Sequence, residues 1–319
     1  MDIKFITAEA RNKMKPRILV VGSINMDLLM MVSRMPLPGE SMLSEKYQFG
    51  PGGKGANQAV AAAQLGGDVT LACKVGDDEF GAQLKQSLIN KDVCVEFVST
   101  SPGNNSGFGV IMMEESGNNR IITHLAANRD LNKADIDLAF TRDYDGMIVQ
   151  FEIIEDMVIY ACEQARKRNI PFVVDAGPAL NFPLEKISGM EILSPNETET
   201  QALCGITPID KKSCMDAAQM LTKRTNAKHI VLKMGDKGAM HYHNGQIKHY
   251  ASYKVEPVDV TAAGDVFTAA MTVRYLTGGD MDEAIRYANA AGALAVTKAG
   301  AQESVPCADE VSAFIKKCV

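Results

Sequence analysis

The sequence has no continuous apolar stretch approaching the ~20 residues that a membrane-spanning helix requires. Its seven cysteines are odd in number and include no C-x-x-C pair, which argues against a disulfide framework or a zinc ribbon and predicts a cytoplasmic protein. An excess of basic residues is also lacking, since the formal net charge is −6. We therefore expect neither a nucleic-acid partner nor a membrane partner.

The N-terminal residues lack the apolar core of a signal peptide, because they mix lysine, arginine, aspartate and glutamate. We interpret residues 1–16 as an N-terminal extension and residues 17–319 as the folded part of the chain. The composition, with 46% hydrophobic and 23% charged residues, is that of an ordinary globular protein. The length is sufficient for a large core.

Short apolar runs, typical of buried parallel strands, recur along the chain and alternate with segments of helical spacing. The predicted strands are residues 17–22, 69–74, 146–150, 172–175, 192–194 and 229–233. The predicted helices include residues 56–65, 155–168 and 216–224. This alternation predicts an α/β fold with a doubly wound, mostly parallel sheet sandwiched by helices.

Two segments break the alternation and are typical of antiparallel hairpins: residues 28–49, with a proline-rich turn, and residues 97–125, around Gly117-Asn118. We expect them to pair as a small β-sheet lid, formed by about residues 28–50 and 97–127. The exposed strand edges of such a lid favour a homodimer formed through the lid.

A third hairpin is expected at residues 241–250, on the main domain. Its three histidines, His241, His243 and His249, are interpreted as exposed hairpin residues and not as a metal site.

A glycine-rich loop, G-P-G-G-K-G-A-N at residues 50–57, leads into a predicted helix, where glycines let the backbone approach a ligand closely. A dinucleotide fingerprint fits poorly, because the loop does not follow the first strand and Asp68 comes too early for the acidic partner. A Walker A loop does not fit, because Gly55 follows Lys54 where serine or threonine is required. The alternative to a ligand-binding loop is a turn that only initiates the helix and leaves Lys54 solvated.

A second loop, V-D-V-T-A-A-G-D-V-F at residues 258–267, precedes an apolar helix. Successive N–H groups in such a turn, together with the helix dipole, favour an anion such as a phosphoryl group. Asp265 would then be placed to take the proton of an attacking hydroxyl. The alternative is that Asp265 only caps the helix.

The two loops together resemble the paired motifs of the ribokinase (PfkB) family, G-G-K-G-A-N-x-A and D-x-x-A-A-G-D. Further segments are similar to family motifs in the same order: G-S-I-N-M-D at 22–27, P-G-E at 38–40, G-D-D at 76–78, P-N-E-T-E at 195–199, and G-A-Q with S-V-P at 300–306. The resemblance covers about residues 16–319 and implies a kinase domain over 17–319.

The resemblance implies ATP-dependent phosphorylation of D-ribose at its 5-hydroxyl group. It implies that Asp265 is the catalytic base and that Ala262, Ala263 and Gly264 form an anion hole for the transferred phosphoryl group. The implied sugar-binding residues are Asn25, Asp27, Gly53, Lys54, Asn57, Glu152 and Asp265.

The resemblance also implies a nucleotide site, whose residues are Asn196, Lys233, Gly235, Asp236, Gly238, Gly264 and Asn289. Asn196 and Glu199 are expected to hold Mg²⁺ through water. A monovalent cation, usually K⁺, is implied as an activator. Its expected surroundings are Asp259, Thr261, Ala295, Lys298, Gly300 and Ser304.

Two departures from the family pattern leave the identity of the sugar substrate open. Ala176-Gly177-Pro178 replaces an N-P-A-P stretch, and residues 125–128 replace a common G-A-N. The alternatives are a related kinase acting on a nucleoside, fructose or 2-keto-3-deoxygluconate, and a sugar-binding regulator without catalysis. A dinucleotide-dependent oxidoreductase is a more distant alternative.

Overall fold

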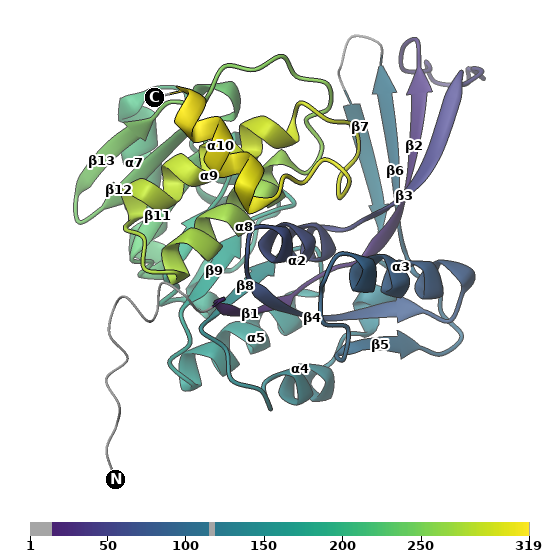
Figure 1. The fold of residues 1–319 in the computed structure, drawn as a ribbon, viewed down its shortest axis with the longest axis horizontal. Helices are drawn as coiled ribbons and strands as arrows, with labels where there is room; N and C mark the ends of the chain where they lie inside the picture. The colour runs from purple at the N-terminus through teal and green to yellow at the C-terminus, as the bar shows by residue number, and fades with distance from the viewer. Residues whose placement is uncertain (1–14, 115–118, 319) are drawn as a thin grey trace.

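The computed structural model describes residues 15–114 and 119–318. In this part of the chain, nine strands form one large sheet in the order β13-β12-β11-β10-β9-β8-β1-β4-β5 (Figure 1). The strands from β11 to β5 in this order pair in parallel, and β12 and β13 are added antiparallel at one edge. Their bounds are β1 Arg17–Val21, β4 Asp68–Gly76, β5 Val98–Ser101, β8 Gly146–Gln150, β9 Phe172–Asp175, β10 Ile192–Ser194, β11 His229–Lys233, β12 Ala239–His243 and β13 Gln246–Tyr250.

Helices cover both faces of the large sheet because its central strands are apolar on both sides. In β1, Ile18 and Val20 join one core cluster, and Leu19 and Val21 join the other. The first cluster packs under α2 Lys54–Gln64, α3 Glu79–Asn90, α8 Ala263–Leu276 and α9 Met281–Ala295. The second packs under α4 Lys133–Ala139, α5 Glu155–Lys167, α6 Glu197–Cys204 and α7 Lys211–Thr225. The predicted doubly wound α/β fold is confirmed.

Capping side chains decide where several helices begin. Helix α7 begins at Lys211, ahead of the predicted residue 216, because the side chain of Asp210 accepts a hydrogen bond from the Ser213 N–H group. Asn196 and Glu199 form a reciprocal capping box at the start of α6. The last helix, α10, spans Ala308–Cys318. No helix in the described ranges is long and apolar enough to cross a membrane.

Four further strands form a separate sheet in the order β3-β2-β6-β7, which extends beside α2 and α3 (Figure 1). Their bounds are β2 Asn25–Val32, β3 Lys46–Gly52, β6 Gly107–Glu114 and β7 Asn119–His124. The two predicted hairpins do pair with each other, through the parallel contact between β2 and β6. The second hairpin begins at Gly107, not at residue 97, because β5 pairs with β4 in the large sheet. The predicted turn at Gly117-Asn118 lies outside the described residues, as do residues 1–14 of the proposed extension.

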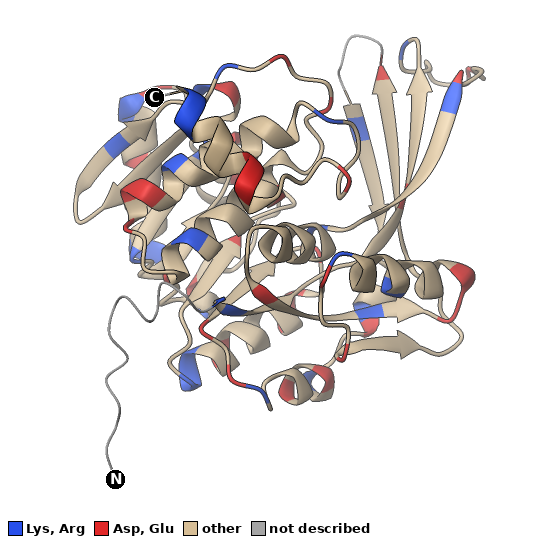
Figure 2. Cartoon of the chain, viewed as in Figure 1, with Lys and Arg blue, Asp and Glu red and all other residues tan. Residues whose placement is uncertain are grey.

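Acidic and basic residues are interspersed over the described part of the chain (Figure 2). Most ion pairs are exposed, such as the Arg17–Asp145 pair at 3.0 Å, and pairs of this kind contribute ~0–1 kcal/mol each. The ion pairs among Lys233, Asp175, Glu199 and Asp265 are instead buried, and Lys54, which pairs with Asp265, is partly buried.

The hairpin of β12 and β13 forms as predicted, but its histidines are not all exposed. His241 is buried, and its Nε2 atom lies 2.9 Å from Nδ1 of the buried His229 in a hydrogen bond. The prediction of exposed hairpin residues is therefore wrong for His241, because its side chain lies against β11. No group of three or more metal-ligating side chains with suitable geometry occurs in the described residues.

The buried histidine pair predicts an acid-dependent loss of stability. Burial lowers the pKa of His229 and of His241 to about 4, below the value of ~6.5 in an unfolded chain. The unfolded state therefore binds protons that the folded state rejects, and stability falls as the pH drops from 6.5 towards 4. Urea unfolding between pH 7.5 and 5 measures this slope.

The His241→Phe variant, which removes one titrating ring and retains an aromatic side chain, is expected to show a shallower slope than the wild type. The matched control is His249→Gln, because His249 is exposed. Equal slopes for the wild type and His241→Phe would contradict this account.

Candidate active site

The candidate site lies where the carboxyl ends of the parallel strands meet the start of α2 and α8, as expected for open α/β sheets. The glycine-rich loop ends β3 and begins α2, with Gly53 at the N-cap position and a φ of 87°. A Cβ atom at Gly55 would lie 2.6 Å from the backbone nitrogen of Ser23, so glycine is required for α2 to pack against the end of β1.

Asp265 lies in the first turn of α8 but does not cap the helix. Its Oδ2 atom accepts a hydrogen bond from Asn57 Nδ2 at 3.0 Å, and its Oδ1 atom accepts one from Gln58 Nε2 at 3.0 Å. The ammonium group of Lys54 lies 3.7 Å from Oδ1. The N-cap residue is Ala262, with no side-chain bond. The capping interpretation of Asp265 and the solvated interpretation of Lys54 are therefore both wrong.

The turn before Asp265 contains a residue in the left-handed conformation, as anion-binding nests do. Ala262 has a φ of 60°, in the left-handed region that a residue with a side chain seldom adopts. Strain of this kind costs about 1–3 kcal/mol and is concentrated at functional sites. The nearest atom to a Cβ built on Gly264 is Lys233 Nζ, at 3.7 Å. The turn therefore has open space and a cation beside it.

The four-stranded sheet contributes Asp27, which lies on β2 over two glycines. A Cβ at Gly52 would lie 1.9 Å from Asp27 Oδ2, and one at Gly109 would lie 2.2 Å from Oδ1. Burial, together with the nearby carboxylates of Glu152 and Asp265, raises the pKa of Asp27 to about 7. The carboxylate therefore fits a site where hydroxyl groups of a ligand donate hydrogen bonds to it.

Glu152 and Asn25 are fixed by buried partners. Glu152 Oε2 accepts hydrogen bonds from Ser23 Oγ at 2.5 Å and from the Lys54 backbone N–H at 2.9 Å. Asn25 Oδ1 accepts a hydrogen bond from Asn128 Nδ2 at 2.9 Å. The structure thus brings together all the predicted sugar-binding residues, which are Asn25, Asp27, Gly53, Lys54, Asn57, Glu152 and Asp265.

Three carboxylates and two ammonium groups form the buried centre of the site. Burial opposes the charge of Lys54, but the carboxylates of Asp265, Asp175 and Glu199 outweigh it and raise the pKa of Lys54. Burial likewise opposes the charge of Asp175, but Lys233 and Lys54 outweigh it and lower the pKa of Asp175. Asp175 and these two lysines therefore stay ionised at neutral pH.

Some of the predicted nucleotide residues border this centre, and others lie at the end of β13. Asn196 pairs with Lys233 in a single β-bridge, and Lys233 Nζ lies 3.9 Å from Glu199 Oε2. Gly235 and Asp236 lie in a short 3₁₀ turn, which ends before Gly238. Asn289, on α9, donates hydrogen bonds to the carbonyl oxygens of Tyr250 and Ala251. A Cβ atom at Gly238 would lie 2.1 Å from the same carbonyl oxygen of Tyr250. Asn289 and Gly238 therefore meet at the end of β13.

The residues predicted for Mg²⁺ have the donor chemistry that this ion prefers. Asn196 and Glu199 supply only oxygen atoms, but Asn196 Oδ1 and Glu199 Oε2 are used by the capping box. Glu199 Oε1 lies 2.6 Å from the Cβ position of Gly177, so this oxygen faces the space that the glycine leaves. One carboxylate oxygen fits an ion that keeps most of its water ligands.

The residues predicted for a monovalent cation come from two loops that Asp259 joins. Its Oδ1 atom accepts a hydrogen bond from Thr261 N at 2.9 Å, and its Oδ2 atom accepts one from Gly300 N at 2.9 Å. Ser304, four residues after Gly300, is fully buried. The backbone N–H group of Lys298 donates a hydrogen bond to the carbonyl oxygen of Ala295. The ammonium group of Lys298 pairs with Glu310, so only its backbone is available to the loops.

Sequence reasoning missed several buried polar residues around the site. Gln58, Asp175, Gln150 and Asn128 are each at most 1% exposed and make side-chain hydrogen bonds to one another or to predicted site residues. Polar residues at the end of a buried strand or inside an alanine-rich helix are a weak signal for such a role. Asn128 lies in the stretch identified above as a departure, yet it fixes Asn25.

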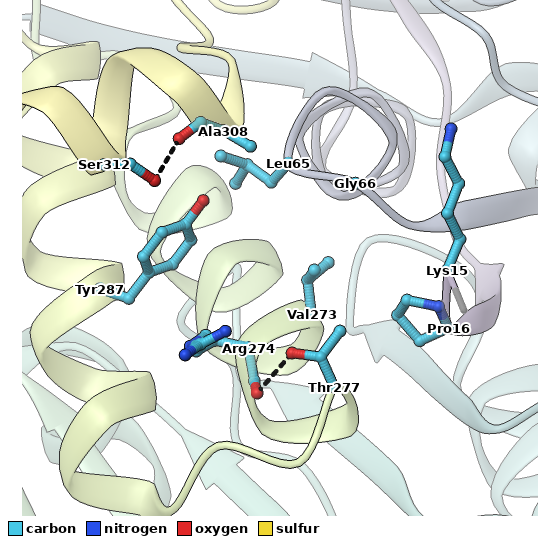
Figure 3. A pocket seen from close by; sticks show the side chains of 10 residues that line it. All are labelled: Lys15, Pro16, Leu65, Gly66, Val273, Arg274, Thr277, Tyr287, Ala308 and Ser312. Atoms are coloured by element: carbon cyan, nitrogen blue, oxygen red, sulfur yellow. Dashed lines mark hydrogen bonds between the residues drawn. The ribbon is translucent and has the colours of Figure 1, made fainter. Parts of the chain in front are cut away.

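A separate cavity of about 290 Å³ lies between the C-terminal ends of α2 and α8, the middle of α9 and the start of α10 (Figure 3). It is lined by Leu65, Arg274 and Tyr287, among others, and by no predicted site residue. Leu65 follows the C-terminal end of α2, whereas the site lies at the N-terminal end, about 16 Å away for a helix of 11 residues. This cavity is therefore not the active site.

Comparison with known proteins identifies the family. The sequence model of the pfkB family of carbohydrate kinases matches residues 15–308. The chain is 32% identical over 305 residues to a ribokinase of Haemophilus influenzae, covering 95% of this chain and 99% of the relative. It is 31% identical over 301 residues to a deoxyribokinase of Salmonella typhi, covering 93% and 98%.

Solved structures agree with this assignment. The structure of Arabidopsis thaliana ribokinase complexed with ribose and ATP is similar with a TM-score of 0.86 and 29% identity, covering 95% of this chain and 99% of that chain. A ribokinase of Giardia lamblia gives a TM-score of 0.88 at 25% identity, with 96% and 100% coverage. The chain belongs to the pfkB family of carbohydrate kinases and is an ATP-dependent sugar kinase.

Proposed function

We propose that this kinase transfers the γ-phosphoryl group of ATP to the 5-hydroxyl group of D-ribose. The observation that carries the proposal is Asp265, which lies in the first turn of α8 without capping it and is held by two amide donors beside an open turn. The relatives named as ribokinases, and the ribose and ATP in the similar Arabidopsis structure, support this sugar.

In the proposed reaction, Asp265 accepts the proton of the 5-hydroxyl as its oxygen attacks the γ-phosphorus of ATP. The new O–P bond forms while the bond between the γ-phosphorus and the β–γ bridging oxygen breaks, and ADP leaves. The nest at Ala262, Ala263 and Gly264 and the helix dipole stabilise the charge on the transferred group. Lys233 Nζ, beside Gly264, adds a positive charge there.

The sugar hydroxyls are proposed to bond to Asn25, Asp27, Asn57 and Glu152, with Lys54 as a donor and Gly53 giving close backbone access. Each hydroxyl both donates and accepts, so amide and carboxylate groups are suitable partners. The lid, formed by the four-stranded sheet, would close over the sugar and exclude water that would otherwise accept the phosphoryl group.

Magnesium, when bound with ATP, supplies charge neutralisation at the phosphate oxygens. Glu199, through its Oε1 atom, and Asn196 would hold it by way of water. Asn196, Gly235, Asp236, Gly238 and Asn289 are proposed to contact the nucleotide.

A monovalent cation, K⁺ above all, is proposed to order the two loops that Asp259 joins. Its surroundings would be Asp259, Thr261, Ala295, Lys298, Gly300 and Ser304, the last three following α9. Because the first loop continues into the nest, ordering it would preorganise the anion hole. K⁺ is expected to raise kcat and the melting temperature, and a rise in neither would contradict the site.

A homodimer through the lid is proposed because β3 and β7 leave unpaired edges and exposed apolar side chains. Leu43, Tyr47, Ile121 and Ile122 are each more than half exposed. Pairing of lid edges in two copies would cover them. Light scattering at working concentration is expected to give the mass of a dimer, and a monomer mass would contradict the assembly.

Release of ADP from ATP and Mg²⁺ tests the proposed function. D-ribose, 2-deoxyribose, fructose and adenosine are compared as acceptors, each with and without K⁺. Ribose is expected to give the highest kcat/KM. A higher value for 2-deoxyribose would fit the similar deoxyribokinase better and change the sugar but not the chemistry. Sugar binding without turnover on any acceptor would favour the regulator instead.

The pKa of Asp27 predicts how sugar affinity depends on pH. Because this pKa is raised to about 7, the free carboxyl group is protonated below that pH. Sugar hydroxyls that donate to the carboxylate must first displace this proton, so the Kd for ribose is expected to rise by up to about tenfold per pH unit below 7. Calorimetric titration without nucleotide, between pH 5.5 and 8.5, measures this effect.

The Asp27→Asn variant is the control for this titration, since its amide does not titrate in this range. It is expected to bind ribose weakly at every pH. It should also be more stable than the wild type at pH 8 without sugar, because the wild-type carboxylate is then ionised against its environment. A wild-type Kd that is constant from pH 5.5 to 8.5 would show that Asp27 does not accept these bonds.

A further inference from the structure

Gln58 lies between two buried carboxylates. Its Nε2 atom donates one hydrogen bond to Asp175 Oδ2 at 2.7 Å and one to Asp265 Oδ1 at 3.0 Å. An amide nitrogen carries two hydrogens, so both are used. Gln150 Nε2 donates to Gln58 Oε1 at 2.6 Å, which fixes the end of the Gln58 amide that faces the carboxylates. Gln58 and Asp175 are fully buried.

Asp175 extends this connection to a lysine. Its Oδ1 atom accepts a hydrogen bond from Lys233 Nζ at 2.8 Å, and Thr268 Oγ1 lies 3.3 Å from its Oδ2 atom. Lys233 Nζ in turn lies 3.7 Å from the Cβ position of Gly264, the neighbour of Asp265. A continuous path of hydrogen bonds therefore joins Asp265 to an ammonium group, and both ends of the path meet the same turn.

Gln58 places an uncharged donor between two carboxyl groups. The side chains of Asp175 and Asp265 lie on either side of it, and the ammonium groups of Lys233 and Lys54 lie beside them. Carboxylates this close repel each other, and low dielectric strengthens the repulsion. The two N–H groups of Gln58 offset the repulsion between Asp175 and Asp265 without adding a charge.

We propose that Gln58 and Asp175 are positioning residues: Gln58 fixes the base Asp265, and Asp175 fixes the ammonium group of Lys233 beside the anion hole. The proposal rests on the proposed function, because it assigns these roles relative to the base and the transferred phosphoryl group. It explains why an alanine-rich helix buries glutamine next to the sugar-binding Asn57. Neither residue needs to touch the sugar or the nucleotide.

Gln58→Met removes both donors while keeping nearly the same side-chain volume. We expect kcat to fall about 10²-fold, the loss typical of a misplaced catalytic group, with the KM values for sugar and ATP changed less than threefold. The matched control is Gln64→Met on the same helix, because Gln64 makes only a 3.4 Å bond to the Lys91 carbonyl oxygen. It is expected to retain wild-type kcat.

A double-mutant cycle separates positioning from a general structural role. In the Asp265→Asn background, Gln58→Met is expected to cause little further loss, because the base through which it acts is already gone. Asp175→Asn is likewise expected to lower kcat in the wild type but add little in a Lys233→Met background. Equal losses with and without the partner substitution would overturn the proposal.

One further variant and a crystal structure keep the proposal falsifiable. Gln58→Glu preserves the shape if Gln58→Met fails to fold, and it must lose at least as much activity because it adds a third carboxylate between the other two. A crystal structure of either variant is expected to show Asp265 turned away from Asn57 in an otherwise unchanged fold. An unmoved Asp265 would overturn the positioning role, whereas absence of sugar-dependent turnover in the wild type would overturn only the proposed function.

Discussion

Replacing Asp265 by asparagine is expected to lower kcat by roughly 10²–10⁴-fold while leaving the Kd for ribose within about tenfold. The asparagine keeps the size of the side chain and still offers one oxygen atom, which can accept from either Asn57 or Gln58, so the fold should persist. What is lost is the group that accepts the proton of the attacking hydroxyl. Steady-state ADP release and calorimetric sugar binding measure the two quantities separately.

The control for this substitution is Asp280→Asn, at the start of the neighbouring helix α9. Asp280 is exposed and accepts a hydrogen bond from the Glu283 N–H group at 2.8 Å, so it is a true capping residue. Asparagine caps helices as well as aspartate does, and this variant should retain wild-type kcat. A loss of less than tenfold in Asp265→Asn would show that Asp265 is not the base.

The second large effect is expected from Gly52→Ala in the lid. The added Cβ would lie 1.9 Å from Asp27 Oδ2 and 2.4 Å from its Cγ, so the carboxylate must move. Hydrogen bonds to a charged group contribute ~1.5–3 kcal/mol, and their loss corresponds to a rise of roughly 10- to 100-fold in KM for the sugar. The KM for ATP should change little, since Asp27 lies on the lid.

Gly50→Ala is the matched control, because Gly50 lies two residues away on the same strand and points to the same face. No atom lies within 4 Å of a Cβ built there, so sugar KM should stay near the wild-type value. If both variants raise KM equally, the effect comes from the strand and not from the displacement of Asp27.

The sequence alone predicts most of the parallel strands and the location of both loops, because buried parallel strands and glycine-rich turns have strong local signals. Spacing does not predict whether Asp265 caps its own helix or bonds to another one. That outcome depends on the approach of α2 to α8, which allows Asn57 and Gln58 to reach Asp265 before any backbone N–H group does. Long-range packing of this kind has no local signature.

The remaining misses have similar causes. The strand Val98–Ser101 looks like the start of a hairpin, but its partner is β4, about 25 residues earlier in the chain. His241 has the alternating pattern of an exposed strand residue, but β11 and the His229 ring cover it. Gln58 and Asp175 resemble ordinary polar residues until the sheet brings Lys233 next to them.

The central claim is that the phosphoryl group of ATP is transferred to the 5-hydroxyl group of ribose. The most direct test is to incubate the wild-type enzyme with ATP, Mg²⁺ and ¹³C-labelled D-ribose and to examine the product by ³¹P and ¹³C NMR. The account predicts ribose 5-phosphate, recognised by coupling of phosphorus to C5, in amounts equal to the ADP formed. Phosphate on another carbon, or release of inorganic phosphate alone, would contradict it.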